Sequence, residues 1–207
     1  MIKKAYSLFF KGLRKVYYII LSLLDKLRCQ LLFYGNRVNH RDYKTKGLPY
    51  LMVARGGEFL IGENFRMNNT IASNPIGCAQ PCMFFVDRNA KLIIGDHVSM
   101  SQSALVCHVG ITIGDYVKIG GGVCIYDTDF HSLDAKIRRD SMADMANKKK
   151  LPVVIHDNVF IGAHSKILKG VTIGENSIIG ASAVVTKDIP ANEIWGGNPA
   201  KKIKSII

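Results

Sequence analysis

Long hydrophobic runs are missing from this 207-residue sequence, and their absence argues against a membrane-spanning helix. The longest apolar stretch runs from Val16 to Leu24 and is interrupted at Ser22, whereas a spanning helix needs ~20 apolar residues. No small-residue cleavage site follows it, so a secretory signal peptide is not expected. Proline is scarce at 6 residues and glycine plentiful at 19. With 48% hydrophobic and 21% charged residues, the composition is that of a folded globular protein.

Cysteine pairs are also missing. The five cysteines are an odd number, and none of them form a Cys-x-x-Cys motif. Cys78 and Cys82 are separated by three other residues and have no second pair of ligands beside them. This usage predicts reduced, buried thiols in a cytosolic protein rather than disulfides, a redox pair or a zinc site.

Acidic residues are few, and the excess of basic charge is confined to one end. The chain has 28 Lys and Arg against 16 Asp and Glu. Residues 1–46 hold 11 of the basic residues but only Asp25 and Asp42 as acids. The rest of the chain is nearly neutral, so nucleic acid is not an expected partner.

A strict period of six begins at Ile155. The first position of each hexad is aliphatic, at Ile155, Ile161, Ile167, Ile173, Ile179 and Val185. The fifth position is small or β-branched, at Val159, Ser165, Val171, Ser177 and Ala183. The same phase recurs upstream at Ile94, Met100, Val106, Ile113, Ile119 and Ile125, and more weakly at Ile61 and Met67. Period six fits neither a helix nor a simple alternating strand and predicts a parallel β-helix with about three hexads per coil.

Two breaks in this phase, and the two ends of the chain, define the expected organisation. One residue is inserted between Val106 and Ile113, and a long loop occupies 127–150. We expect a basic amphipathic helical arm at 1–46, the β-helix domain at 47–195 and a basic tail at 196–207. The helix is predicted over 1–35, where apolar residues recur at spacings of three and four. The arm either caps the open end of the β-helix or lies on the anionic inner face of a membrane, and the two are compatible.

The sequence resembles the hexapeptide-repeat acyltransferases. Within them it resembles sugar O-acetyltransferases of the galactoside and maltose type and those of bacterial surface-polysaccharide biosynthesis. The resemblance covers roughly residues 92–203. The motifs that carry it are Ile113-Gly-Asp-Tyr-Val-Lys-Ile-Gly120, Tyr126-Asp-Thr-Asp-Phe-His-Ser132, Val159-Phe-Ile-Gly-Ala163, Ile167-Leu-Lys-Gly-Val-Thr-Ile-Gly174, Ile179-Gly-Ala-Ser-Ala-Val-Val-Thr-Lys-Asp-Ile-Pro190 and Gly197-Asn-Pro-Ala-Lys201. The fold implied is an all-β solenoid, a left-handed parallel β-helix. The implied assembly is a homotrimer with active sites between subunits.

The resemblance also implies roles for particular residues. His131, at the start of the long loop, matches the family's catalytic base. Acetyl-CoA, the acyl donor, is expected along Ala163, Ala181, Thr186 and Lys187, with its phosphates near Lys201 and Lys204. Asp129 and Ser101 are candidate contacts to the acceptor, although galactoside-type members place an Asn near Ser101. Phe160 stands where the family commonly has Trp.

Acetyl transfer needs a base of near-neutral pKa, which suits the imidazole of His131. Asp127, Asp129 or Asp134 could orient its second nitrogen, as could a backbone carbonyl, and His108 is the next candidate base. We expect an acetyltransferase acting on a sugar hydroxyl in a cytoplasmic polysaccharide-assembly step, by direct attack on the thioester. The alternatives are N-acetylation of an amino sugar and, in another class, a non-catalytic or metal-binding prism. No closely spaced His pair of the zinc-binding kind is present, so no metal is expected.

Overall fold

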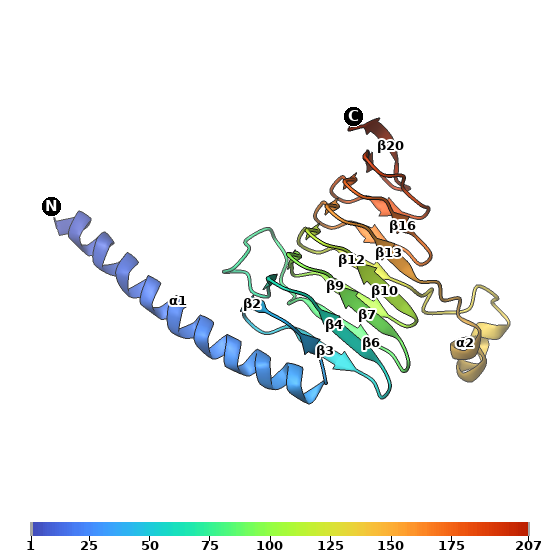
Figure 1. Ribbon diagram of the computed structural model, residues 1–207, viewed down its shortest axis with the longest axis horizontal. Coiled ribbons are helices and arrows are strands. Elements are labelled where there is room, and N and C mark those ends of the chain that lie inside the picture. Colours follow the sequence, from blue (N-terminus) through green and yellow to red (C-terminus); the bar gives the residue numbers. More distant parts are fainter. Residues whose placement is uncertain (1, 207) are drawn as a thin grey trace.

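The computed structural model describes residues 2–206, and its body is a stack of coils built from three mainly parallel sheets (Figure 1). Sheet A contains β1 (Asn39–His40), β4 (Glu58–Ile61), β7 (Lys91–Ile94), β10 (Gly110–Ile113), β13 (Val153–Ile155) and β16 (Thr172–Ile173). Sheet B contains β2 (Tyr43–Lys46), β5 (Phe65–Asn68), β8 (Ser99–Ser101), β11 (Lys118–Ile119), β14 (Phe160–Ile161), β17 (Ile178–Ile179), β19 (Glu193–Gly196) and β20 (Lys201–Ser205). Sheet C contains β3 (Tyr50–Val53), β6 (Met83–Val86), β9 (Ala104–Cys107), β12 (Cys124–Tyr126), β15 (Lys166–Ile167) and β18 (Val184–Val185).

The chain visits sheets A, B and C in turn, and each visit to all three makes one coil. Within each sheet, a strand pairs in parallel with the corresponding strand of the next coil, except that β20 runs antiparallel to β19. We call the turns between sheets the A–B, B–C and C–A corners. The predicted basic tail at 196–207 is therefore partly a strand, with β20 extending sheet B.

The aliphatic hexad positions form columns inside the stack. Ile113 pairs in register with Ile94 below it and Ile155 above it, and all three are buried. The fifth positions are buried as well, at Val159, Ser165, Val171, Ser177 and Ala183. Both positions point inward because alternate residues of a strand face the same side.

The predicted phase is wrong at Val106. The interior residue is Leu105, which pairs with Phe84 and Ile125, whereas Val106 is only half-buried on the outer side of sheet C. The spacing from Met100 to Leu105 is five residues, so the shortened turn lies between β8 and β9. The extra length follows β9, at the C–A corner.

Glycine at the second hexad position allows successive coils to approach closely at the corners. A Cβ added to Gly95 would lie 2.8 Å from the carbonyl carbon of Gly114, and one on Gly162 would lie 2.5 Å from the amide nitrogen of Ala181. Neither glycine has a positive φ. Steric crowding between coils therefore selects glycine here, as the hexad pattern predicts.

The long helix α1 (Ile2–Gly35) confirms the helix predicted from the sequence, but only its C-terminal part packs on the body. Cys29 and Phe33 are completely buried, and the Phe33 ring lies 4.8 Å from that of Tyr43 in β2. The Asp25 carboxylate accepts a 2.7 Å hydrogen bond from the Gly47 amide. The N-terminal part projects away from the first coil (Figure 1).

The long loop leaves and re-enters the stack at neighbouring points of the C–A corner. It contains a short 3-10 turn (Ile137–Arg139) and the helix α2 (Ser141–Asn147), which stands off the stack in Figure 1. Thr128 forms an antiparallel bridge with Lys150, and the Leu151 amide donates to the Asp127 carbonyl at 2.9 Å. Because its ends are joined in this way, the loop does not disturb the sheet, and β10 still pairs in register with β13.

Candidate active site

His131 lies at the beginning of the long loop and is oriented by a carboxylate from α2. Its Nδ1 lies 2.6 Å from Oδ2 of Asp144, while Oδ1 of Asp144 accepts a 2.6 Å hydrogen bond from the Ser132 amide. The Asp144 side chain is 9% exposed and that of His131 is 69% exposed. The imidazole is therefore fixed on one side and open on the other.

Electrostatics favour an ionised carboxylate at Asp144. Hydrogen bonds from His131 and from the Ser132 amide hold the pKa of Asp144 below its ordinary value. Because an ionised carboxylate can only accept, the proton between the two side chains belongs to Nδ1 of His131. Nε2 then carries the free lone pair, which is the arrangement a general base requires.

The three acids named from the sequence do not orient His131. Asp127 is fully buried and accepts hydrogen bonds of 2.7 Å from the amides of His108, Val109 and Gly110, so it fixes the base of the loop. Asp129 forms a 2.5 Å ion pair with Lys169 of the next coil, and its Oδ2 is buried without a partner in the described part of the chain. Asp134 accepts a 2.7 Å hydrogen bond from the Lys136 amide.

Sequence reasoning missed Asp144 because it lies 13 residues beyond His131, outside the flanking motif. The available signal was Asp140, which caps α2 by accepting a 2.7 Å hydrogen bond from the Ala143 amide. A helix starting at that cap places position 144 in its first turn.

A second His–Asp pair lies at the same corner, one coil below the loop. Nδ1 of His108 is 2.6 Å from Oδ2 of Asp87. Partial burial acts to raise the pKa of Asp87, but hydrogen bonds from the Arg88 amide and from His108 outweigh this effect. The pKa of Asp87 is therefore lowered. The imidazole of His108 is largely buried and its ring centroid lies 5.2 Å from that of Phe85. The pair resembles the His131–Asp144 pair in chemistry but is much less accessible.

The residues expected to contact the donor lie at two different corners of the chain. Ala163 and Ala181 follow β14 and β17 at the B–C corner, whereas Thr186 and Lys187 follow β18 at the C–A corner. The Lys187 ammonium lies 5.2 Å from the ring centroid of Trp195, over the last coil. One chain by itself therefore does not gather these four residues into a single groove.

The remaining predicted residues are similarly divided. Lys201 and Lys204 are exposed on β20, and Phe160 is exposed on the outer face of sheet B. Ser101 ends β8 at the B–C corner and accepts a 3.0 Å hydrogen bond from Asn68, while Asp129 lies at the C–A corner. His156 and His164 are exposed. Across residues 2–206, no group of three or more His, Cys, Asp or Glu side chains is placed to hold a metal ion.

The repeat region is similar to that of known transferases. Residues 152–187 match the family model described as bacterial transferase hexapeptide (six repeats). Galactoside O-acetyltransferase from Escherichia coli (strain K12) is 41% identical over 96 residues, which are 46% of this chain and 44% of that protein. The resemblance to the hexapeptide-repeat acyltransferases is confirmed.

A solved structure extends this likeness to most of the chain. The hexapeptide-repeat acetyltransferase of Vibrio cholerae O1 biovar eltor, complexed with acetyl coenzyme A, has 26% sequence identity and a TM-score of 0.57. The match covers 89% of this chain and 79% of that one. Among curated hexapeptide-repeat relatives, however, the chain spans only about half the length of the proteins it matches.

Proposed function

We propose that this protein is an acetyl-CoA-dependent acetyltransferase that acetylates a sugar hydroxyl during bacterial surface-polysaccharide biosynthesis. The observation that carries the proposal is the exposed imidazole of His131, held by the carboxylate of Asp144 at 2.6 Å. Relatives named galactoside O-acetyltransferase and the acetyl-coenzyme A complex of the Vibrio cholerae protein support the acyl group and the sugar acceptor. The five cysteines are free and buried, which supports a reducing, cytoplasmic location.

The chemistry follows from the tautomer that Asp144 favours. Nε2 of His131 removes the proton from the acceptor hydroxyl while that oxygen attacks the carbonyl carbon of the acetyl thioester. The tetrahedral intermediate collapses, the carbon–sulfur bond breaks, and the CoA thiolate takes the proton from Nε2. Asp144 stabilises the imidazolium that exists between the two proton transfers. No Ser or Cys acyl-enzyme is required.

We further propose that the body is a left-handed β-helix that assembles as a homotrimer with its sites between subunits. The division of the donor residues supports this. The B–C corner of one subunit, with Ala163 and Ala181, would face the C–A corner of the next, with Thr186 and Lys187. Lys201 and Lys204 are exposed and can bind the nucleotide phosphates as point charges. Oδ2 of Asp129, two residues before His131, can accept a hydrogen bond from the acceptor sugar.

The direct test is a screen of acceptor sugars with radiolabelled acetyl-CoA, comparing the wild type with His131→Ala. We expect label to enter a hydroxylated sugar and to be released by mild base, because esters are labile there and amides are not. Label stable to mild base would indicate N-acetylation of an amino sugar. If calorimetry detected no binding of CoA at all, the chain would be a non-catalytic scaffold and the proposal would fail.

A further inference from the structure

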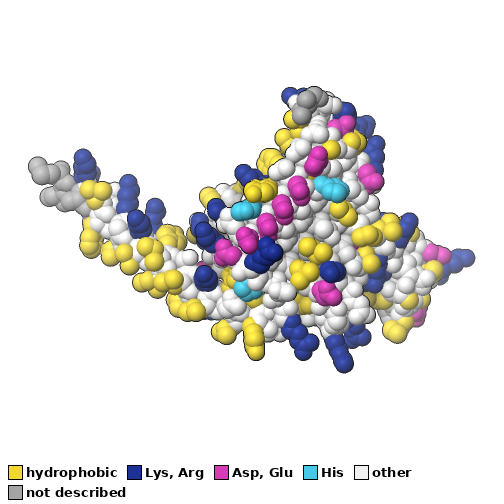
Figure 2. Space-filling model, viewed as in Figure 1, with side chains coloured by type: hydrophobic (Ala, Val, Ile, Leu, Met, Phe, Trp, Pro, Cys, Tyr) yellow, Lys and Arg dark blue, Asp and Glu magenta, His cyan; other side chains and the backbone are white. Residues whose placement is uncertain are grey.

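Helix α1 carries a long apolar face that no other part of the described chain covers. We define the apolar stripe as nine exposed side chains that recur every three or four residues. They are Tyr6, Phe9, Leu13, Val16, Ile20, Leu23, Leu27, Leu31 and Tyr34. In Figure 2 the hydrophobic side chains of the helix gather along the edge turned away from the body. An exposed face of this length is unusual for a soluble surface and indicates an interaction site.

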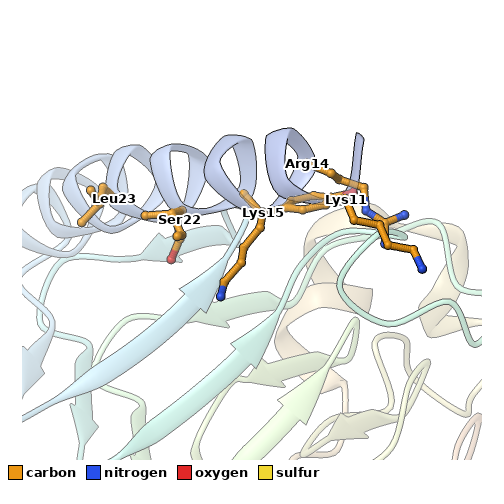
Figure 3. Close-up of a pocket in the computed structure, with 7 residues that line it drawn as sticks. Lys11, Arg14, Lys15, Ser22 and Leu23 are labelled. Carbon is orange, nitrogen blue, oxygen red and sulfur yellow. The ribbon is translucent and has the colours of Figure 1, made fainter. Parts of the chain in front are cut away.

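The opposite face of the helix is basic and turned toward the body. Figure 3 shows Lys11, Arg14 and Lys15 extending from α1 on the side of the strands, where they line a hollow. Arg14 and Ser22 also line a second hollow, together with Lys46 and Thr70 of the body. On this side Cys29 and Phe33 are buried against the first coil, so the stripe faces away from the attachment.

The charge of the helix has a single sign. Residues 2–35 contain seven Lys and Arg and one acid, Asp25. Asp25 is already engaged with the Gly47 amide. Among the described helices, none has a stretch long and apolar enough to cross a membrane. A helix with an apolar aromatic and aliphatic face, a polar face rich in Lys and Arg, and no spanning segment is suited to lie within the surface of a bilayer.

We propose that α1 lies in the plane of an anionic membrane surface, with the apolar stripe entering the boundary between headgroups and acyl chains. Each Lys or Arg near such a surface is attracted to the anionic lipids, and salt screens this attraction. Because the body is attached on the side opposite the stripe, the helix can lie flat without the coils blocking it. The proposal is independent of the acetyl-transfer chemistry.

Pairing with a second copy is the competing use of the stripe, since spacings of three and four also occur in coiled coils. The positions beside the stripe favour the membrane. Phe10, Tyr17 and Leu24 are exposed where a coiled coil usually carries charged residues, so the apolar face is wider than a helix pair would cover.

The test uses the full chain and vesicle flotation with phosphatidylglycerol–phosphatidylcholine mixtures or phosphatidylcholine alone. The stripe variant is Leu13→Gln with Leu27→Gln, at side chains 54% and 65% exposed. Glutamine has nearly the helix propensity of leucine, so the helix should persist. The control variant is Tyr116→Gln with Ile203→Gln, whose side chains are 56% and 65% exposed on the stack of coils.

We expect the wild type and the control variant to bind anionic vesicles and to release as salt is raised. The stripe variant should bind roughly 100-fold more weakly, at about tenfold per leucine removed from the apolar phase. Thermal unfolding of the two variants should match that of the wild type. Equal binding by the stripe variant, or no binding of the wild type to anionic vesicles, would overturn the proposal. So would a smaller oligomer for the stripe variant by sedimentation without vesicles, because the stripe would then join copies of the chain.

Discussion

Asp144 offers the sharpest test of the site because its substitution changes one property of His131 and leaves the imidazole in place. In Asp144→Asn the side-chain oxygen can still accept from the Ser132 amide, so the loop keeps that contact. The amide group then faces Nδ1 of His131 as a donor. It favours the tautomer with the proton on Nε2, which can no longer act as the base.

The size of the effect is bounded by the role of the base itself. Removing a general base typically costs ~10²–10⁴ in rate. Losing the group that orients the base cannot cost more than losing the base. We therefore expect Asp144→Asn to lower kcat by about 10²-fold or more, but by less than His131→Ala. The KM for acetyl-CoA should change little, since the proposed donor residues lie on other coils.

The assay is the pH dependence of kcat with the acceptor found in the screen. The wild type should show an ascending limb as the imidazole loses its proton. In Asp144→Asn the plateau above this limb should be much lower, because most of the neutral imidazole then carries its proton on Nε2. The matched control is Asp134→Asn, which removes a carboxylate from the same loop. Within the described residues, that carboxylate accepts one hydrogen bond, from the Lys136 amide.

A double variant completes the test. If the two residues act as a unit, Asp144→Asn should add no further loss in a His131→Ala background. Near-normal turnover of Asp144→Asn, with the plateau of the pH profile unchanged, would refute the assigned role of Asp144. Additive losses in the double variant would also contradict it.

Three further predictions concern the base, the donor groove and the core. His131→Ala should lower turnover by ~10²–10⁴ without changing acetyl-CoA affinity by calorimetry; near-normal turnover would move the base to His108. Ala181→Trp should abolish CoA binding and leave the melting temperature unchanged, because residue 181 is exposed at the B–C corner. Unchanged CoA affinity would mean that this corner is not part of the donor site. Leu105→Ala should destabilise by roughly 2–5 kcal/mol in denaturant titration, whereas Val106→Ala, on the outer side of sheet C, should cost far less. Equal losses of stability in the two variants would instead support Val106 as the interior residue, as the hexad pattern predicts.

The fold was predictable to the extent that its interior repeats. The columns through Ile113 and Ile155 follow from period six, because each hexad returns one inward side chain to the same place. The exception at Leu105 depends on the length of a single turn, and alternation within β9 does not reveal it. The helix over residues 1–35 was likewise evident from spacing, but where it detaches from the body depends on the contacts of Cys29 and Phe33.

The site was less predictable because it depends on contacts between segments distant in sequence. The prediction that His131 is the catalytic base rests on its motif, whereas Asp144 reaches it only through the folding of α2. Asp129, close in sequence, is instead paired with Lys169, which lies one coil further along the stack. Local sequence therefore predicted His131 as the candidate base but did not predict its partner Asp144.

The joined ends of the long loop have a consequence for how such proteins diversify. Because Thr128 and Lys150 meet, and the coils on either side stay in register, the segment between them can be exchanged without altering the stack. The same segment carries His131 and Asp144. A transplanted loop would thus bring the proposed base and the acid that orients it together. We therefore expect lineages that share this stack to acquire new acceptor preferences by replacing about two dozen residues, while the scaffold and the corners proposed to bind the donor are inherited unchanged.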